Sequence, residues 1–268
     1  MGSFSAAGLR SGKAFALVVA CAALLPAAAM AEDWKFSSSV NYATGKYGTT
    51  DRVDSLYVPF TLKRYYTNAD ISVTIPYVRQ SSVGQVIWVG GNPVHATKTR
   101  TVAATSEQSG LGDIMLRGSY ALNREDPRSF DLGLAGSLKL PTADENKGLG
   151  TGQPDAGAGL EFSKELGPNW TMLADAYYTV IGEPAGADFN NRLSLDLGFT
   201  KLLREHLYLT VLFEAQSAIV AGNEPPRSLS GSLAYGAPDA TQFSGGLTLG
   251  LSDGSPQIGL SAGLSRRF

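Results

Sequence analysis

Apolar and polar residues alternate with a period of two along most of the chain beyond about residue 33. This period is typical of a β-strand whose two faces meet different surroundings, because successive side chains point to opposite sides. In one segment, for example, Phe130, Leu132 and Leu134 share a face, and Asp131 lies on the other. The pattern predicts twelve strands, at residues 33–42, 54–64, 69–79, 112–122, 129–140, 155–166, 169–181, 191–202, 206–217, 227–235, 241–252 and 256–268.

The length and spacing of these segments predict a membrane-spanning barrel. Most are close to the roughly 9–11 residues that a tilted strand needs to cross a bilayer. An even strand number places both ends of the barrel on one side, and short turns should alternate with longer outer loops. We therefore predict an all-β fold: a transmembrane antiparallel up-and-down β-barrel formed by residues 32–268, with a long outer loop at residues 80–111.

A soluble β-sandwich is the alternative, because its strands alternate too. Two features favour the barrel: the polar face is rich in Gly and Ser and poor in Lys, and aromatic residues gather at the segment ends. Aromatic girdles at both membrane interfaces are typical of such barrels. The candidate girdle residues are Trp34, Tyr42, Tyr65, Tyr66, Tyr77, Tyr120, Trp170 and Tyr178.

Residues 1–31 have the pattern of a secretory signal peptide. Arg10 and Lys13 precede an apolar run, and Ala29-Met30-Ala31 fits a cleavage site. A lipoprotein signal ending at Cys21 is the alternative, but the apolar run continues beyond that cysteine. We expect export to a bacterial outer membrane, with membrane lipid and the barrel-assembly machinery as partners.

Composition excludes several kinds of site. Cys21 is the only cysteine, so a mature chain without residues 1–31 has neither a disulfide nor a thiolate metal site. The formal net charge of −2 becomes −4 when Arg10 and Lys13 are removed, which suggests no nucleic-acid partner.

Neither a catalytic site nor a cofactor site is predicted. Only His95 and His206 could act as histidine bases, and the sequence places no serine against either, so we expect no enzymatic activity. Asp144, Glu145 and Asp155 could together suggest calcium, but they show no EF-hand-like spacing, and we expect neither metal nor cofactor.

The polar faces of the predicted strands carry charges that should point into the lumen. Such groups are costly at membrane depth unless they pair or touch water. They could select solutes at a constriction, or they could form ion pairs that only hold the barrel closed. The residues are Lys63, Asp113, Arg117, Asp131, Lys139, Glu161, Asp175, Arg192, Asp196 and Glu214, of which Asp113, Arg117, Lys139 and Glu161 are expected to form one cluster below the outer mouth.

Several short motifs resemble one outer-membrane family. They are the terminal Phe268, which resembles a barrel-assembly signal, and the segments Gly110–Asp113, Leu140–Asp144, Gly148–Gly152 followed by Asp155, and Ser252–Pro256. Together they resemble the transporters assigned to the meta-pathway of phenol degradation, over about residues 110–268. The resemblance implies passage of small hydrophobic or aromatic molecules across the outer membrane.

The long connector at 80–111 bears on that function. Val86–Val89 followed by Gly90-Gly91-Asn92-Pro93 predicts a hairpin. It could fold inward as a plug or extend two strands outward, and we expect the extension. We accordingly predict a channel for small solutes, with a structural or surface-interaction barrel of occluded lumen as the alternative.

Overall fold

The computed structural model describes residues 34–81, 86–89, 92–95, 107–124, 130–184 and 186–268. The predicted signal peptide lies outside the described residues. The strands are β1 (Trp34–Gly45), β2 (Val53–Tyr65), β3 (Ala69–Gln80), β4 (Val86–Val89), β5 (Asn92–His95), β6 (Gln108–Leu111), β7 (Ile114–Asn123), β8 (Asp131–Leu140), β9 (Asp155–Gly167), β10 (Trp170–Val180), β11 (Arg192–Arg204), β12 (Leu207–Gln216), β13 (Arg227–Tyr235), β14 (Thr241–Gly250) and β15 (Ile258–Arg267).

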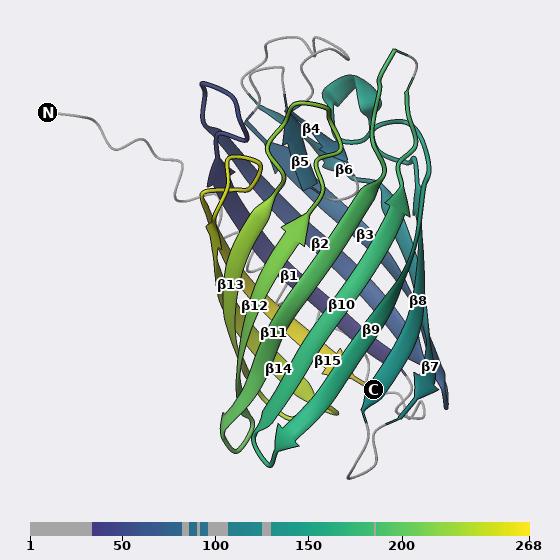
Figure 1. Cartoon of the computed structure of the whole chain (residues 1–268), viewed down its shortest axis with the longest axis vertical. Coiled ribbons are helices and arrows are strands. Elements are labelled where there is room, and N and C mark those ends of the chain that lie inside the picture. The colour runs from purple at the N-terminus through teal and green to yellow at the C-terminus, as the bar shows by residue number, and fades with distance from the viewer. Residues whose placement is uncertain (1–33, 82–85, 90–91, 96–106, 125–129, 185) are drawn as a thin grey trace, which may run out of the picture.

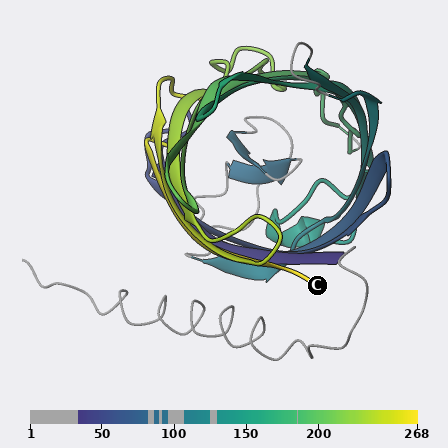
Figure 2. The same cartoon turned by 90° about the horizontal axis from the view of Figure 1, so that it is seen from below.

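Twelve antiparallel strands form a closed barrel, as the alternation predicts (Figure 1). Consecutive strands pair around the ring, and β1 closes it by pairing with both β2 and β15. Viewed along its axis, the barrel is a continuous ring of strands (Figure 2). Within the described residues there is no helix long and apolar enough to cross a membrane.

The predicted segment at 112–122 needs one correction. The strand begins earlier, as β6, and is interrupted at Gly112 and Asp113 before it continues as β7. Both parts pair with β3. The amide of Gly112 donates to the carbonyl of Pro76 at 2.8 Å, so the interrupted strand stays in the sheet.

Large apolar side chains are exposed on the outer face of the barrel. Leu195, Leu197 and Phe199 on β11 are examples, while the residues between them are polar or glycine. This arrangement suits a barrel whose outer surface meets lipid and whose interior is polar.

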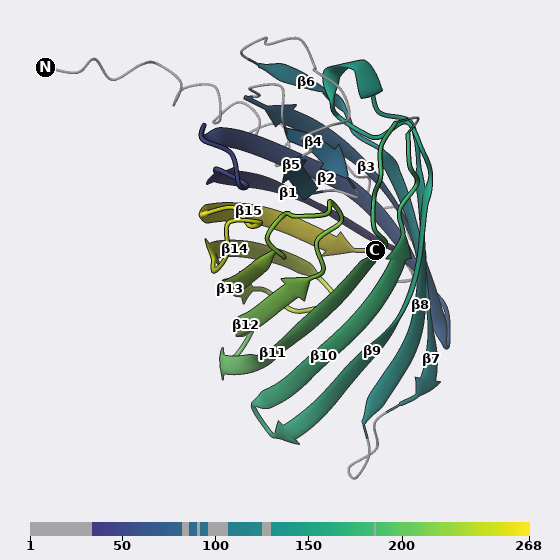
Figure 3. The ribbon, with the colours of Figure 1, turned by 45° about the horizontal axis from the view of Figure 1, so that its top comes forward.

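Both ends of the barrel chain meet at the end that carries the short turns. The amide of Trp34 donates to the carbonyl of Phe268 at 3.0 Å, and the amide of Phe268 donates to the carbonyl of Trp34 at 2.8 Å. The longer loops and strands β4, β5 and β6 lie at the opposite end (Figure 3).

Deleting Phe268 should lower the amount of folded barrel, because it removes both backbone hydrogen bonds to Trp34. A closed barrel migrates faster on a gel before heating than after it, so the fast band measures folding. Phe268→Ala keeps the backbone pair and is the matched variant. If Phe268 is also the assembly signal, both variants should reduce the fast band in membranes. Unchanged bands for both variants would contradict a role of Phe268 in barrel closure as well as in assembly.

Candidate functional site

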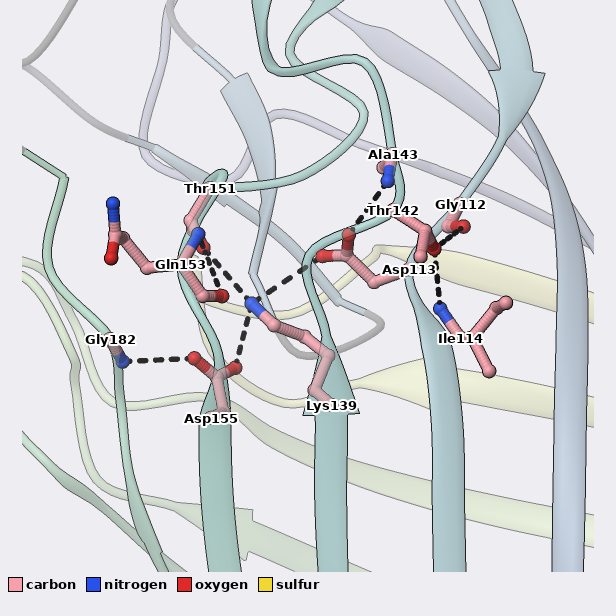
Figure 4. Close-up of polar contacts among 10 residues, drawn as sticks. All are labelled: Gly112, Asp113, Ile114, Lys139, Thr142, Ala143, Thr151, Gln153, Asp155 and Gly182. Carbon is pink, nitrogen blue, oxygen red and sulfur yellow. Dashed lines mark hydrogen bonds and ion pairs between the residues drawn. The ribbon is translucent and has the colours of Figure 1, made fainter.

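Lys139 on β8 has an almost fully buried side chain, with 1% exposed. Its Nζ lies 3.0 Å from Asp155 Oδ2 and 3.4 Å from Asp113 Oδ2, and it donates to Thr151 Oγ1 at 3.0 Å (Figure 4). A buried ammonium is tolerated only when it is paired and hydrogen-bonded. We call Lys139, Asp113, Asp155 and Thr151 the Lys139 cluster.

The two carboxylates of the Lys139 cluster also bind loop backbone. Asp113 Oδ1 accepts a hydrogen bond from the amide of Ala143 at 3.0 Å, and Asp155 Oδ1 accepts one from the amide of Gly182 at 2.9 Å (Figure 4). The cluster therefore joins the loop after β8 and the loop after β10 to the barrel wall.

The short motifs of the sequence meet around this cluster. Thr142 Oγ1 accepts from the amide of Ile114 at 3.0 Å and donates to the carbonyl of Gly112 at 3.2 Å. A Cβ on Gly150 would lie 2.7 Å from Asp113 Oδ2, so glycine is required for this approach. The segments Gly110–Asp113, Leu140–Asp144 and Gly148–Gly152 thus form one packed structure.

Hairpin β4–β5 is a separate two-stranded sheet that this packed structure holds. The amide of Trp88 donates to the carbonyl of Gly148 at 3.0 Å. The Trp88 ring stacks on Tyr57 of β2, with centroids 5.6 Å apart, and packs against Val78 and the buried Leu149. One side of the hairpin is therefore anchored to the wall near β2 and β3.

The other side of the hairpin contacts different loops. Val89 packs with Ile181, Phe189 and Ile219, which belong to the loops after β10 and β12. Figure 2 shows β4 and β5 inside the ring of strands. The expectation that Val86–Val89 would extend the barrel outward is wrong, because β4 pairs only with β5 and its apolar side chains pack against the barrel wall and loops of the outer mouth.

A third contact completes the support of the hairpin. Val86 packs with Val53 and with Tyr47 of the loop between β1 and β2. Burial raises the pKa of Tyr47 to about 12. The hairpin thus touches loops from several sides of the outer mouth and narrows it.

The hairpin leaves a cavity beside it. This cavity has a volume of about 560 Å³ and lies between β5 and the wall of β11–β14. Its rim includes the exposed Glu224 and Asp253, and its wall includes Arg192 and Glu214. A space of this size falls within the range of small-molecule sites.

Four carboxylates lie side by side along the inner wall below this cavity. Glu161 is the direct cross-strand partner of Asp175, Asp175 of Asp196, and Asp196 of Glu214. We call these four residues on β9–β12 the acidic row. Glu214 lines the 560 Å³ cavity, whereas Glu161 and Asp175 line a second cavity of about 380 Å³ at the end with the short turns.

Within the part of the chain that the structure describes, one cation forms an ion pair with the acidic row. Arg117 on β7 forms an ion pair with Glu161 and a hydrogen bond with Tyr177, and its guanidinium lies 4.7 Å from the Tyr177 ring centre. Tyr177 also donates to Glu161 at 2.6 Å. Glu214 accepts a hydrogen bond from Ser228 at 3.2 Å.

The predicted lumen charges are therefore distributed over several groups. Asp113 and Lys139 meet in one cluster and Arg117 and Glu161 in another, and no ion pair among the described residues joins the two. Lys63 pairs with Asp70 at 2.9 Å near the short turns. That these residues select solutes stays a prediction.

Three residues of these groups were not predicted as lumen residues: Asp155, Thr151 and Tyr177. Asp155 belongs to a family motif and was weighed as a calcium ligand, but its pairing with Lys139 was not predicted. Among the described residues no group of three or more His, Cys, Asp or Glu is arranged to hold a metal. Thr151 lies within the Gly148–Gly152 motif, whose contact with Lys139 the sequence does not indicate, and Tyr177 had no signal beyond its place on a polar face. The alternation of β10 places Tyr177 with Asp175, which could have indicated an inward phenol.

Comparisons with known proteins agree with this architecture. A family model described as "Putative MetA-pathway of phenol degradation" matches residues 35–268. An outer membrane channel from Pseudomonas putida F1 superposes with a TM-score of 0.68 at 13% identity, over 91% of this chain and 100% of that one. The NanC porin (TM-score 0.56, 8% identity, 87% and 100% covered) and the KdgM porin (0.52, 8%, 87% and 99%) are similar in fold. Comparison with curated protein sequences gave no match.

Lys139→Met should lower the free energy of unfolding by about 3–5 kcal/mol, because it leaves two buried carboxylates without their cation. Lys147→Met is the control: Lys147 lies 3.7 Å from Asp144 in a pair that is about half exposed, which is worth roughly 0.2–1 kcal/mol. Urea unfolding in detergent micelles measures both. Equal losses would show that the Lys139 cluster contributes no more than a surface pair.

Proposed function

The chain belongs to the family described as "Putative MetA-pathway of phenol degradation", and on this premise we propose that it is a channel for small, hydrophobic or aromatic molecules. The proposed location is a bacterial outer membrane. The signal-like pattern of residues 1–31 and the outward apolar side chains of the barrel support that location.

The observation that carries the channel proposal is the pair of interior cavities. The hairpin β4–β5 covers only part of the outer mouth, and the 560 Å³ cavity lies beside it. The acidic row runs from this cavity to the lower one at Glu161 and Asp175. We propose that solutes pass along this wall of β9–β12.

The apolar side of the upper cavity supports the choice of solute. Pro93 and Val94 of β5 and Ile219 of the loop after β12 face the polar wall that contains Arg192 and Glu214. A small molecule with an apolar body and one polar edge suits such a space. We propose passive diffusion along this wall, from the 560 Å³ cavity to the lower cavity of about 380 Å³.

We also propose that the chain is not an enzyme. His95 lies on the hairpin at the outer mouth, and His206 lies in a short turn at the other end, 3.5 Å from Glu205. The two histidines therefore cannot serve one site. The proteins of similar fold are named as a channel and porins.

A second candidate function has an observation in its favour. Hairpin β4–β5 is packed by apolar contacts on several sides, as a permanent plug would be. The alternative is then a structural or surface-interaction barrel with an occluded lumen.

Liposome swelling separates the two candidates. We expect wild-type protein to admit small neutral solutes slowly. Trp88→Ala should raise the rate several-fold, because it removes the stack on Tyr57 and the contact with Leu149. Trp170→Ala, on the outer face, is the control and should leave the rate unchanged. No swelling by either the wild type or Trp88→Ala would favour the occluded barrel.

Ion selectivity tests the role of the acidic row. Carboxylate rings favour cations, so we expect a preference for K⁺ over Cl⁻ in planar bilayers. Asp196→Asn should reduce that preference, and Arg117→Glu should increase it. Asp144→Asn, in the exposed part of the loop after β8, is the control. If Arg117→Glu lowers thermal stability and leaves selectivity unchanged, Arg117 is a strut.

A further inference from the structure

On the described strands, the outward-facing charged side chains near the end with the short turns are all basic. Each is close to that end of its strand and shares the face of exposed apolar residues: Arg64 follows Leu62, Lys201 follows Phe199, and the outward row of β15 passes Leu260 to reach Arg266. Lys164 on β9 follows Leu160 in the same way. We call Arg64, Lys164, Lys201 and Arg266 the basic collar.

Tryptophans support two members of the collar. Trp34 is the cross-strand partner of Arg64, and Trp170 is the cross-strand partner of Lys201. The Arg64 guanidinium lies 5.1 Å from the Trp34 ring centre and 5.3 Å from that of Tyr66, and Lys201 Nζ lies 4.7 Å from that of Trp170. Tryptophan at a membrane interface prefers the headgroup level, so these rings place both cations there.

Three collar cations have no carboxylate partner among the described residues: Arg64, Lys201 and Arg266. The opposite end differs, because its outward charges are of both signs: Arg79, which pairs with Glu107, Arg227, and Asp54, which accepts a hydrogen bond from Tyr42. Unpaired cations beside lipid require an anion or water. The charge difference between the two ends therefore indicates a ligand at the collar.

We propose that the basic collar binds the headgroups of anionic phospholipids in the leaflet at the end of the barrel that carries the short turns. Phosphate oxygens accept hydrogen bonds from guanidinium and ammonium groups, and acyl chains would lie along the apolar rows above them. Juxtamembrane cations are attracted to anionic bilayers, and salt screens the attraction. The inference rests on the membrane location proposed above and not on passage of any solute.

Thermal unfolding in vesicles tests the collar. Wild-type protein would be refolded into phosphatidylcholine vesicles and into vesicles with one quarter phosphatidylglycerol, and its midpoint measured from the heat-sensitive gel band. We expect a higher midpoint in the anionic vesicles, and a smaller difference at high salt. The variant Arg64→Gln, Lys164→Gln, Lys201→Gln, Arg266→Gln should lose most of that difference.

Controls separate this effect from general charge and from folding. Arg227→Gln changes an exposed cation on the outward face at the opposite end, and should keep the full difference. Lys201→Gln alone should lose part of it, which keeps the test valid if the fourfold variant does not refold. Inorganic phosphate added to neutral vesicles should not raise the midpoint.

Three results would overturn the proposal: equal midpoints in the two vesicle types, an equal loss in Arg227→Gln, or the same rise with inorganic phosphate. Swelling assays in neutral vesicles report on the channel independently. A protein that admits no solute but distinguishes the two lipids would refute the channel and leave the collar standing.

Discussion

Every backbone N–H and C=O group of a strand in lipid has to find its partner on a neighbouring strand, because water is absent and each unpaired group costs several kcal/mol. In this chain the pairing of β1 with both β2 and β15 removes the open edges that a flat sheet would have. The alternation of side chains follows from the same closure, since a closed ring has one apolar outside and one polar inside. Charged side chains are thereby confined to the interior and to the two rims of the barrel.

The interior balances charges in two different ways. At the outer end, Lys139 is surrounded by Asp113 and Asp155 and is sealed by loop backbone, which makes it a rigid support. In the acidic row, Glu161 alone of the four carboxylates forms an ion pair within the described residues, with Arg117, and Glu214 accepts a hydrogen bond from Ser228. Unlike the sealed Lys139 cluster, this wall lines two cavities and so leaves space for solutes.

The strands could be predicted from the sequence because a period of two appears in each segment separately. The partners of the interior charges could not, because they depend on the register between strands: Arg117 meets Glu161 across β8, and the side chain of Tyr177 completes the group from β10. The hairpin was predicted to exist but to extend outward. Its position inside the outer mouth depends on contacts with Leu149, Phe189 and Ile219. These residues lie far along the chain, and the sequence around them does not indicate such contacts. The basic collar could not be predicted for the same reason, because the register between strands places Trp34 beside Arg64 and Trp170 beside Lys201.

Several loops pack against hairpin β4–β5, and this limits how the sequences of those loops can change among related proteins. Exposed loops usually tolerate insertions and rapid sequence drift. Here the tips of several loops are buried against Val86, Trp88 and Val89, so each loop is part of the environment of the others. A lineage that shortens the Gly148–Gly152 segment must also reshape the hairpin that rests on it. Relatives should therefore change these loops together, while the turns at the opposite end vary one at a time.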